Sequence, residues 1–90
     1  MPLLQGKVRG FDFARMTVDF TMLNGTEQVT CGISAAAMDD LEGTDNVTAE
    51  QRITQFHRLR DRIETLASRK FCSNILEANS TVLVKSEDIR

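Results

Sequence analysis

An alternating stretch followed by an Asn-Gly pair is the feature that most constrains the fold of this chain. Over residues 15–23, apolar side chains alternate with polar ones, which predicts a strand with one buried face. Asn24-Gly25 then favours a tight turn, because both residues tolerate positive φ and fit a two-residue type I′ connection. A second strand is expected over residues 26–33. We therefore predict a β-hairpin whose inner face carries Met16, Val18, Phe20, Met22, Val29, Cys31 and Ile33.

Two helices are predicted after the hairpin. Ser34 is a suitable N-cap for a short helix, and Gly43 can supply the left-handed residue that ends it. Thr48 and Gln51 have the spacing of a capping box, so a long helix is expected to begin there and to run to about residue 70. Its apolar residues recur at three- and four-residue intervals and form one stripe that should lie against the sheet: Ile53, Phe56, Leu59, Ile63, Leu66 and Ala67.

The last third of the chain predicts one more strand. Asn79-Ser80 indicates a turn before a short β-branched strand over residues 81–84, and residues 72–78 fit either a strand or a helix end. No segment repeats, and a chain of 90 residues with 41% hydrophobic content suits one core, so we expect a single domain over residues 1–90. The predicted class is α+β: a small antiparallel sheet, built from the N-terminal hairpin and the C-terminal strand, packed against one long and one short helix.

Composition narrows the cellular setting. The early apolar run, Leu3-Leu4, is too short for a signal peptide or a membrane helix, so we expect a cytoplasmic protein with no membrane partner. Cys31 and Cys72 lack C-x-x-C spacing, and both are predicted to be reduced core thiols. The formal charge of −2 gives no general attraction to nucleic acid, which would need a local basic patch.

Motifs for chemistry are not found in the sequence. The nucleotide, metalloprotease and hydrolase motifs are missing, so we predict no enzyme, no metal, no cofactor and no small-molecule ligand. The single histidine, His57, falls at the edge of the apolar stripe and is interpreted as a partly exposed structural imidazole. The acidic residues Asp39, Asp40, Glu42 and Asp45 do not match a calcium loop and are interpreted as a solvated loop.

The segment from Arg9 to Phe13 begins like the RNA-binding strand motif in which paired aromatic rings stack on bases. The similarity ends after five residues, and Asp12 stands where that motif has a small residue. We expect Phe11 and Phe13 to pack under the edge of the sheet instead.

Three arginines of the long helix are predicted to share one exposed face. Arg58, Arg62 and Arg69 lie within about 40° of one another, opposite the apolar stripe, at roughly 100° of rotation per residue. One interpretation is a solvated face with local pairs, such as Arg58 with Asp61 and Arg60 with Glu64. The other is a surface for a partner or for nucleic acid.

Arg60 differs, because the same rotation places it on the apolar side of the helix. An unpaired charge there would be costly. We therefore predict a structural ion pair between Arg60 and a distant carboxylate, either Asp12 or Asp88.

The order of these residues resembles the sequence pattern of a known family. The hairpin contains V-x-F-x-x-x-x-G and ends in C-x-I-S, the long helix contains F-x-x-x-R-x-x-I-x-x-x-A, and the chain ends on V-L-V-x-x-x-D. Together these patterns resemble the bacterial domain-of-unknown-function family numbered 1488. The resemblance implies a small α+β fold in a bacterial cytoplasm and carries over no catalytic residue. The matching positions are Val18, Phe20, Gly25, Cys31, Ile33, Ser34, Phe56, Arg60, Ile63, Ala67, Val82, Val84 and Asp88.

Two functions follow as hypotheses. The first is a non-enzymatic interaction module that acts through a homodimer or a protein partner, because no chemistry is visible and a small sheet offers an exposed face. The alternative is a nucleic-acid-associated regulatory protein that uses the basic face of the long helix. A third reading is an enzyme with a minimal site around His57 or Cys31.

Overall fold

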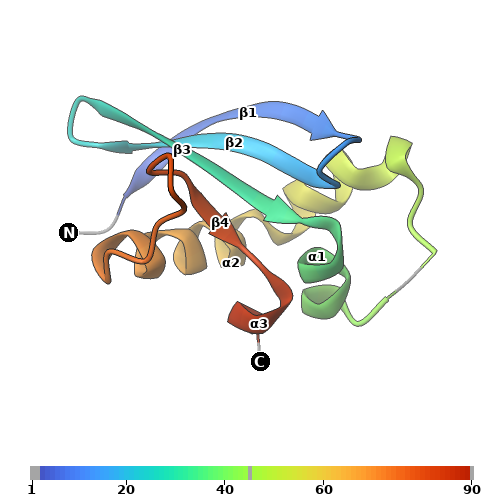
Figure 1. Cartoon of the computed structure of the whole chain (residues 1–90). Coiled ribbons are helices and arrows are strands. Elements are labelled where there is room, and N and C mark those ends of the chain that lie inside the picture. Colours follow the sequence, from blue (N-terminus) through green and yellow to red (C-terminus); the bar gives the residue numbers. More distant parts are fainter. Residues whose placement is uncertain (1–2, 45, 90) are drawn as a thin grey trace.

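The chain folds as a four-stranded sheet with all of its helices on one side. A computed structural model describes residues 3–44 and 46–89. The sheet forms one layer, and the long helix crosses beneath it (Figure 1). This arrangement confirms the predicted α+β class. The elements in chain order are β1 (Leu4–Asp12), β2 (Thr17–Asn24), β3 (Glu27–Ser34), α1 (Ala35–Glu42), the 3₁₀ turn η1 (Ala49–Gln51), α2 (Arg52–Cys72), β4 (Val82–Val84) and α3 (Ser86–Ile89).

The predicted hairpin is confirmed as β2 and β3, which pair antiparallel from Thr17↔Ser34 to Asn24↔Glu27. The turn is displaced by one residue from the expected position, because Gly25 and Thr26 form the loop. Gly25 has a φ of 65°, whereas neither Asn24 nor Thr26 has a positive φ. One positive φ at the first loop position is the pattern of a type II′ turn rather than the type I′ turn we predicted.

A strand that the sequence analysis missed, β1, lies at one edge of the sheet. It pairs antiparallel with β2, and its register shifts twice, between Gln5 and Val8 and again between Val8 and Gly10. At each shift an extra residue is inserted, as in a β-bulge. Bulges break the alternation of apolar and polar residues, which explains why no strand was predicted here. As a result Val8 and Phe11, three positions apart, both pack against the core.

The sheet is mixed, which corrects the prediction of a small antiparallel sheet. The C-terminal strand β4 was expected, but it pairs with β3 in parallel, with Cys31 opposite Val82 and Ile33 opposite Val84. Parallel neighbours need a long crossover, and α1 and α2 supply it. The segment left open in the sequence analysis, residues 72–78, consists of the last residue of α2 followed by a loop, and α3 was not predicted.

The helix ends follow the predicted capping chemistry. The Ser34 hydroxyl accepts a hydrogen bond from the backbone N–H of Ala37, and Gly43 closes α1 with a φ of 68°. The capping box between Thr48 and Gln51 is present, although it opens the 3₁₀ turn η1 that leads directly into α2.

One core joins the sheet to the helices. Six of the seven residues predicted for the inner face of the hairpin are buried. The exception is Met16, which lies in the turn before β2 and is 50% exposed. From α2, the predicted stripe contributes Phe56, whose ring lies 5.0 Å from that of Phe20 between ring centroids. The fully buried residues of this core include Phe20, Met22, Ile33, Met38, Phe56, Ile63, Val82 and Val84.

The first bulge of β1 generates a stability prediction. A Cβ on Gly6 would collide with the backbone carbonyl of Thr21, which cannot move without disturbing β2. We expect Gly6→Ala to destabilise the protein by about 1–3 kcal/mol, the usual cost of overpacking, measured as the free energy of unfolding in urea. Gly32→Ala is the control, because a Cβ there meets Asp19 and Leu83 only at 3.4 and 3.5 Å. Equal stability of the two variants would contradict the bulge geometry.

Candidate binding surface

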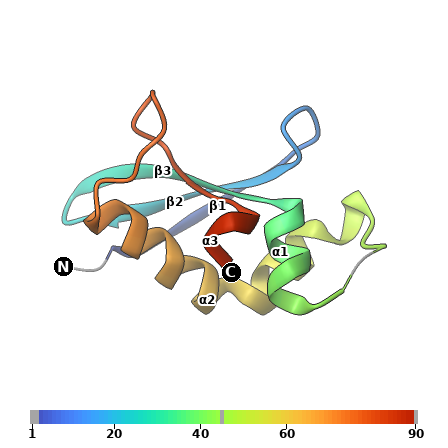
Figure 2. The same ribbon diagram turned by 60° about the horizontal axis from the view of Figure 1, so that its bottom comes forward.

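One face of the sheet is left uncovered by the helices, and two loops rise from it. The first is the β1–β2 turn and the second is the loop before β4, and both stand on the side away from the three helices (Figure 2). Between them the face contains a hollow of about 220 Å³. Its lining includes Arg9, Arg15, Asp19, Thr30, Asn79 and Thr81.

The second bulge of β1 positions Arg9 at this hollow. The register shift leaves Arg9 and Gly10 together opposite Asp19, and Gly10 has a φ of 142°, which favours glycine. The Arg9 side chain is exposed and makes no ion pair with any residue in ranges 3–44 and 46–89. The bulge thus places Arg9 in the lining of the hollow.

The β1–β2 turn positions the second arginine. Asp12 Oδ1 accepts hydrogen bonds from the backbone N–H groups of Ala14 at 3.0 Å and Arg15 at 3.3 Å. At the other end of the turn, the Met16 carbonyl accepts from the N–H of Ala35 at 2.9 Å. These contacts hold the backbone of Arg15, whose exposed side chain also lacks an ion pair within the described part of the chain.

The opposite loop is fixed by its own hydrogen bonds. The N–H of Glu77 donates to the carbonyl of Thr81 at 2.9 Å, and the N–H of Ser80 donates back to the carbonyl of Glu77 at 2.9 Å. The Asn79 side chain accepts from the N–H of Thr81 at 3.3 Å. Both walls of the hollow are therefore ordered by local contacts before any partner is present.

The lining of the hollow carries a net positive charge. Asp19 is its one carboxylate, and Asp19 Oδ1 accepts a hydrogen bond from the Thr17 hydroxyl at 3.0 Å. Thr30 and Thr81 add hydroxyl groups. Two guanidiniums against one carboxylate leave an excess of one positive charge, so the hollow can accept an anionic group.

Exposed apolar side chains lie on the turn beside Arg15. Phe13 is 70% exposed and Met16 is 50% exposed. The ring of Phe13 packs edge-to-face on Phe11, with the centroids 5.2 Å apart. The expectation for Phe11 is confirmed, since it packs against the core, but the expectation that Phe13 packs under the sheet edge is wrong. The turn formed by Asp12 lifts Phe13 into solvent.

Arg60 forms the local pair with Glu64 that one interpretation of the helix predicted, and it has further partners on β1. Its Nε donates to Glu64 at 2.9 Å, its Nη2 donates to the Gly6 carbonyl at 3.0 Å, and its guanidinium lies 5.7 Å from the Phe56 ring centroid. With its amide oxygen turned toward Arg60, Gln5 also accepts from Nε at 2.6 Å.

The predicted pairing of Arg60 with Asp12 or Asp88 is therefore wrong. Glu64 lies one helical turn further on and is already within reach, so no distant carboxylate is needed. Asp12 orders the β1–β2 turn instead. Asp88 accepts from the buried Lys70 at 2.8 Å and thereby holds α3 against α2, a pairing that the sequence analysis missed. Lys70 also donates to the carbonyl of Leu83 at 2.7 Å.

The three arginines of the predicted basic stripe are all exposed, but they do not form one free surface. Arg58 pairs with Glu42 of α1 at 2.9 Å instead of with Asp61. Arg62 donates to the carbonyl of Leu41 at 3.2 Å. Arg69 makes no ion pair among the described residues. The helix α1 therefore occupies two of the three guanidiniums.

The predicted acidic loop is largely part of a cluster between α1 and α2. Asp39 accepts from the buried Arg52 at 2.8 Å and from Gln55 at 3.1 Å. Gln55 also donates to Glu42 at 3.2 Å. Asp39, Asp40 and Glu42 lie on α1 rather than in a loop, which corrects the prediction, and Asp45 lies outside the described residues.

This cluster shifts the pKa of its carboxylates. Burial alone would raise the pKa of Asp39, but the hydrogen bonds from Arg52 and Gln55 outweigh it and lower that pKa below 3.8. The hydrogen bond from Arg58 lowers the pKa of Glu42, and the same contact raises the pKa of Arg58.

The single histidine and the two cysteines differ in their exposure to solvent. His57 is exposed, and its ring packs edge-to-face on Phe56 with the centroids 5.9 Å apart. Neither cysteine forms a disulfide, and Cys31 is buried as predicted, but Cys72 is exposed at the end of α2. Burial is the main cause that raises the pKa of Cys31 to about 12. A thiol with that pKa is a poor nucleophile near neutral pH.

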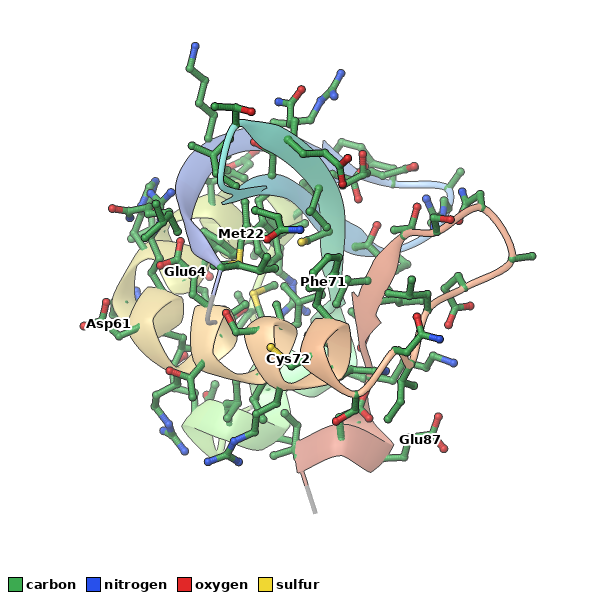
Figure 3. The ribbon with its side chains drawn as sticks, turned by 90° about the vertical axis from the view of Figure 1, so that its left-hand side faces the viewer. Met22, Asp61, Glu64, Phe71, Cys72 and Glu87 are labelled. Carbon is green, nitrogen blue, oxygen red and sulfur yellow. The ribbon has the colours of Figure 1, made fainter. Side chains whose placement is uncertain are left out.

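A larger groove, of about 650 Å³, runs along the opposite side of the molecule between α2 and the start of the chain. Asp61, Glu64 and Cys72 follow one another along α2, with Met22 above them (Figure 3). Leu3 lines the groove and is held by the Ser68 hydroxyl, which accepts from its N–H at 3.1 Å. The charged residues that line this groove are of mixed sign, with Asp61 and Glu64 beside Arg69, so the groove does not favour an ion of either sign as clearly as the hollow on the sheet does.

Two kinds of feature are absent from residues 3–44 and 46–89. None of their helices is long and apolar enough to cross a membrane. Among the same residues, no group of three or more His, Cys, Asp or Glu side chains is placed to hold a metal ion.

Comparison with known proteins identifies similar chains. The model of the family described as "Protein of unknown function (DUF1488)" matches residues 5–83. A crystal structure of a protein of unknown function from the same family, from Shewanella loihica PV-4, has a TM-score of 0.81 and 17% sequence identity, covering 91% of this chain and 90% of that chain. Among curated proteins, none matches. Two positions of the sequence pattern, Val84 and Asp88, lie beyond the matched residues.

The cluster around Asp39 generates a pH prediction. A carboxylate whose pKa is lower in the folded state stabilises the protein above its unfolded pKa, and that stabilisation is lost as the pH falls through the folded pKa. We expect the free energy of unfolding to decrease below about pH 5 and to continue falling below pH 3.8. Asp39→Asn should be less stable at pH 7 and should lose less stability on acidification, as measured by urea unfolding from pH 7 to pH 3.

The control for this experiment is Glu27→Gln, since Glu27 is exposed at the start of β3 and makes no ion pair in the described part of the chain. It should keep the wild-type acid profile. An Asp39→Asn profile parallel to that of the wild type would contradict a coupling of this carboxylate to folding.

The cysteines generate a reactivity prediction. In the native protein, a thiol reagent such as Ellman's reagent should modify Cys72 rapidly, because Cys72 is exposed while Cys31 is 1% exposed. Both thiols should react in denaturant. Cys72→Ser is the control and should show no rapid reaction; rapid modification of that variant would show that Cys31 is accessible.

Proposed function

Because the chain belongs to the DUF1488 family, described as of unknown function, we propose a role from its geometry. In this proposal, the protein is a non-enzymatic interaction module that binds a protein partner on the uncovered face of its sheet. The observation that carries this proposal is the pair of exposed apolar side chains, Phe13 and Met16, on an ordered loop beside the hollow. Aromatic residues and methionine are enriched at protein interfaces, and ordered loops lower the entropic cost of binding.

Order in the surrounding loops supports this role. The β1–β2 turn is held by Asp12 at one end and by the N–H of Ala35 at the other. The facing loop is closed by the hydrogen bonds between Glu77, Ser80 and Thr81. A surface with two fixed walls and an apolar rim can bind without a large rearrangement.

The proposal places the protein in a bacterial cytoplasm. The support is that neither Cys31 nor Cys72 forms a disulfide, as is usual for intracellular proteins. Two observations support a non-enzymatic role. The Cys31 thiol is buried and its pKa is raised, and His57 is exposed and far from Cys31 in the sequence.

A nucleic-acid-associated role on α2 is the alternative. Arg62 and Arg69 remain exposed and free of carboxylate partners among the described residues, so this face retains some positive charge. Arg58, in contrast, is neutralised by Glu42. Binding to nucleic acid through two arginines would be weak and would fall steeply with salt.

The test is affinity capture from host lysate with matched variants. Phe13→Ser/Met16→Ser removes the apolar rim. Leu4→Ser/Ile75→Ser removes the other two large exposed apolar side chains of the described residues, which are 60% and 56% exposed. We expect the rim variant to lose one discrete, nuclease-resistant partner that the wild type and the control variant retain, as quantified by mass spectrometry. Folding of each variant is checked by circular dichroism.

Other outcomes would point elsewhere. Loss of the partner in both variants, or in neither, would contradict the proposed surface. Nuclease-sensitive capture that is abolished by Arg62→Glu/Arg69→Glu would support the nucleic-acid alternative. A dimer in light scattering that dissociates in the rim variant would identify the partner as a second copy of this chain.

A further inference from the structure

We propose that the hollow on the uncovered face of the sheet binds a carboxylate side chain from an acidic segment of the protein partner. This inference rests on the proposed function and specifies the chemistry of the contact. It is carried by two unpaired arginines that line one small hollow.

Charge complementarity is the first argument. Carboxylates of this chain pair with five of its eleven basic side chains: Arg52, Arg58, Arg60, Lys70 and Lys85. Arg9 and Arg15 are not paired in this way within residues 3–44 and 46–89, yet they lie at the same hollow. Guanidiniums bind carboxylates with two parallel hydrogen bonds, so a partner carboxylate would satisfy both groups at once.

Preorganisation is the second argument. Arg9 projects from a β-bulge, and Arg15 follows a turn whose N–H groups are bound by Asp12. Across the hollow, Thr81 is held through the side chain of Asn79. The backbone segments that carry the two arginines and Thr81 are therefore held before the anion binds, which lowers the entropic cost of binding.

Size is the third argument. The hollow is about 220 Å³, which is below the roughly 300–1,000 Å³ of a typical small-molecule site. It is open to solvent on the sheet face and suits one side chain of a larger partner. The neighbouring Phe13 and Met16 would then contact an apolar residue next to the carboxylate.

The same observations favour a protein over a nucleic acid. Because Asp19 offsets one of the two arginines, the hollow has an excess of one positive charge, which matches a single carboxylate better than the successive phosphates of a polynucleotide. Sequence-tolerant binding of single strands also uses several aromatic rings as stacking platforms. The aromatic side chain exposed on this loop is Phe13 alone.

The experiment is a two-dimensional ¹⁵N NMR titration of the full chain. The probe is a capped peptide in which glutamates alternate with phenylalanines, and the matched control is its glutamine counterpart. We expect the acidic peptide to shift the amide signals of Gly10, Thr30 and Gly32, and the glutamine peptide to bind at least about tenfold more weakly. Binding should also weaken as salt is added.

Two charge variants complete the test. Arg9→Glu/Arg15→Glu should weaken the acidic peptide by at least about tenfold, whereas Arg62→Glu/Arg69→Glu, with the same change in net charge, should leave its affinity close to that of the wild type. The milder Arg9→Gln/Arg15→Gln variant replaces the first if that one does not fold.

The proposal is overturned if both reversed variants bind the peptide equally, if the glutamine peptide binds as well, or if poly-uridine binds more tightly than the peptide through Arg9 and Arg15. These failures are distinct from failure of the proposed function. A captured partner that depends on Phe13 and Met16, together with no peptide binding at the hollow, would overturn only this inference.

Discussion

The packing of Phe56 against Phe20 is the contact from which the rest of the structure follows. Both rings are fully buried, and they join the N-terminal part of α2 to β2 in the interior of the sheet. Large aromatic pairs contribute heavily to a core of this size, so the apolar stripe of α2 can be satisfied on one face of the sheet only. The helices α1 and α3 then pack beside α2, and the other face remains free (Figure 2). The candidate surface is exposed because the core lies on only one side of the sheet.

Charged side chains then fasten the helices to one another. Arg52 and Asp39 join α1 to α2, and Lys70 and Asp88 join α3 to α2. Arg60 joins α2 to β1 by donating to the carbonyl of Gly6. Together with Arg58 and Lys85, these residues make five of the eleven basic side chains that pair with carboxylates. Arg9 and Arg15 have no such partner among the described residues, and they differ from the other unpaired arginines because they line the same hollow.

The regular parts of the fold were predictable from sequence, and the irregular ones were not. Alternation from Val18 to Met22 and the cap at Ser34 are local signals, and both are confirmed. The strand β1 was missed because two bulges remove its alternation, although Gly6 and Gly10 marked the positions where it bends. The pairing of Arg60 with Glu64 follows from helical spacing and was predicted as a local pair. The contact of Arg60 with Gly6 and the pairing of Arg52 with Asp39 depend on how α2 lies against β1 and α1, which helical rotation alone does not predict. The same bulge that concealed β1 is what places Arg9 at the hollow.

The parallel pairing of β3 with β4 has a consequence for how the protein is made. Cys31 pairs with Val82 across the segment 32–81, which contains α1 and α2, and such non-local contacts form late and slowly. The hairpin and the long helix depend on local contacts and can form earlier. One wall of the hollow belongs to the loop that precedes β4, so the recognition surface is assembled in the last step of folding. A chain that has not completed its sheet would present the arginines of the first wall without the second, and such an intermediate would not hold its partner.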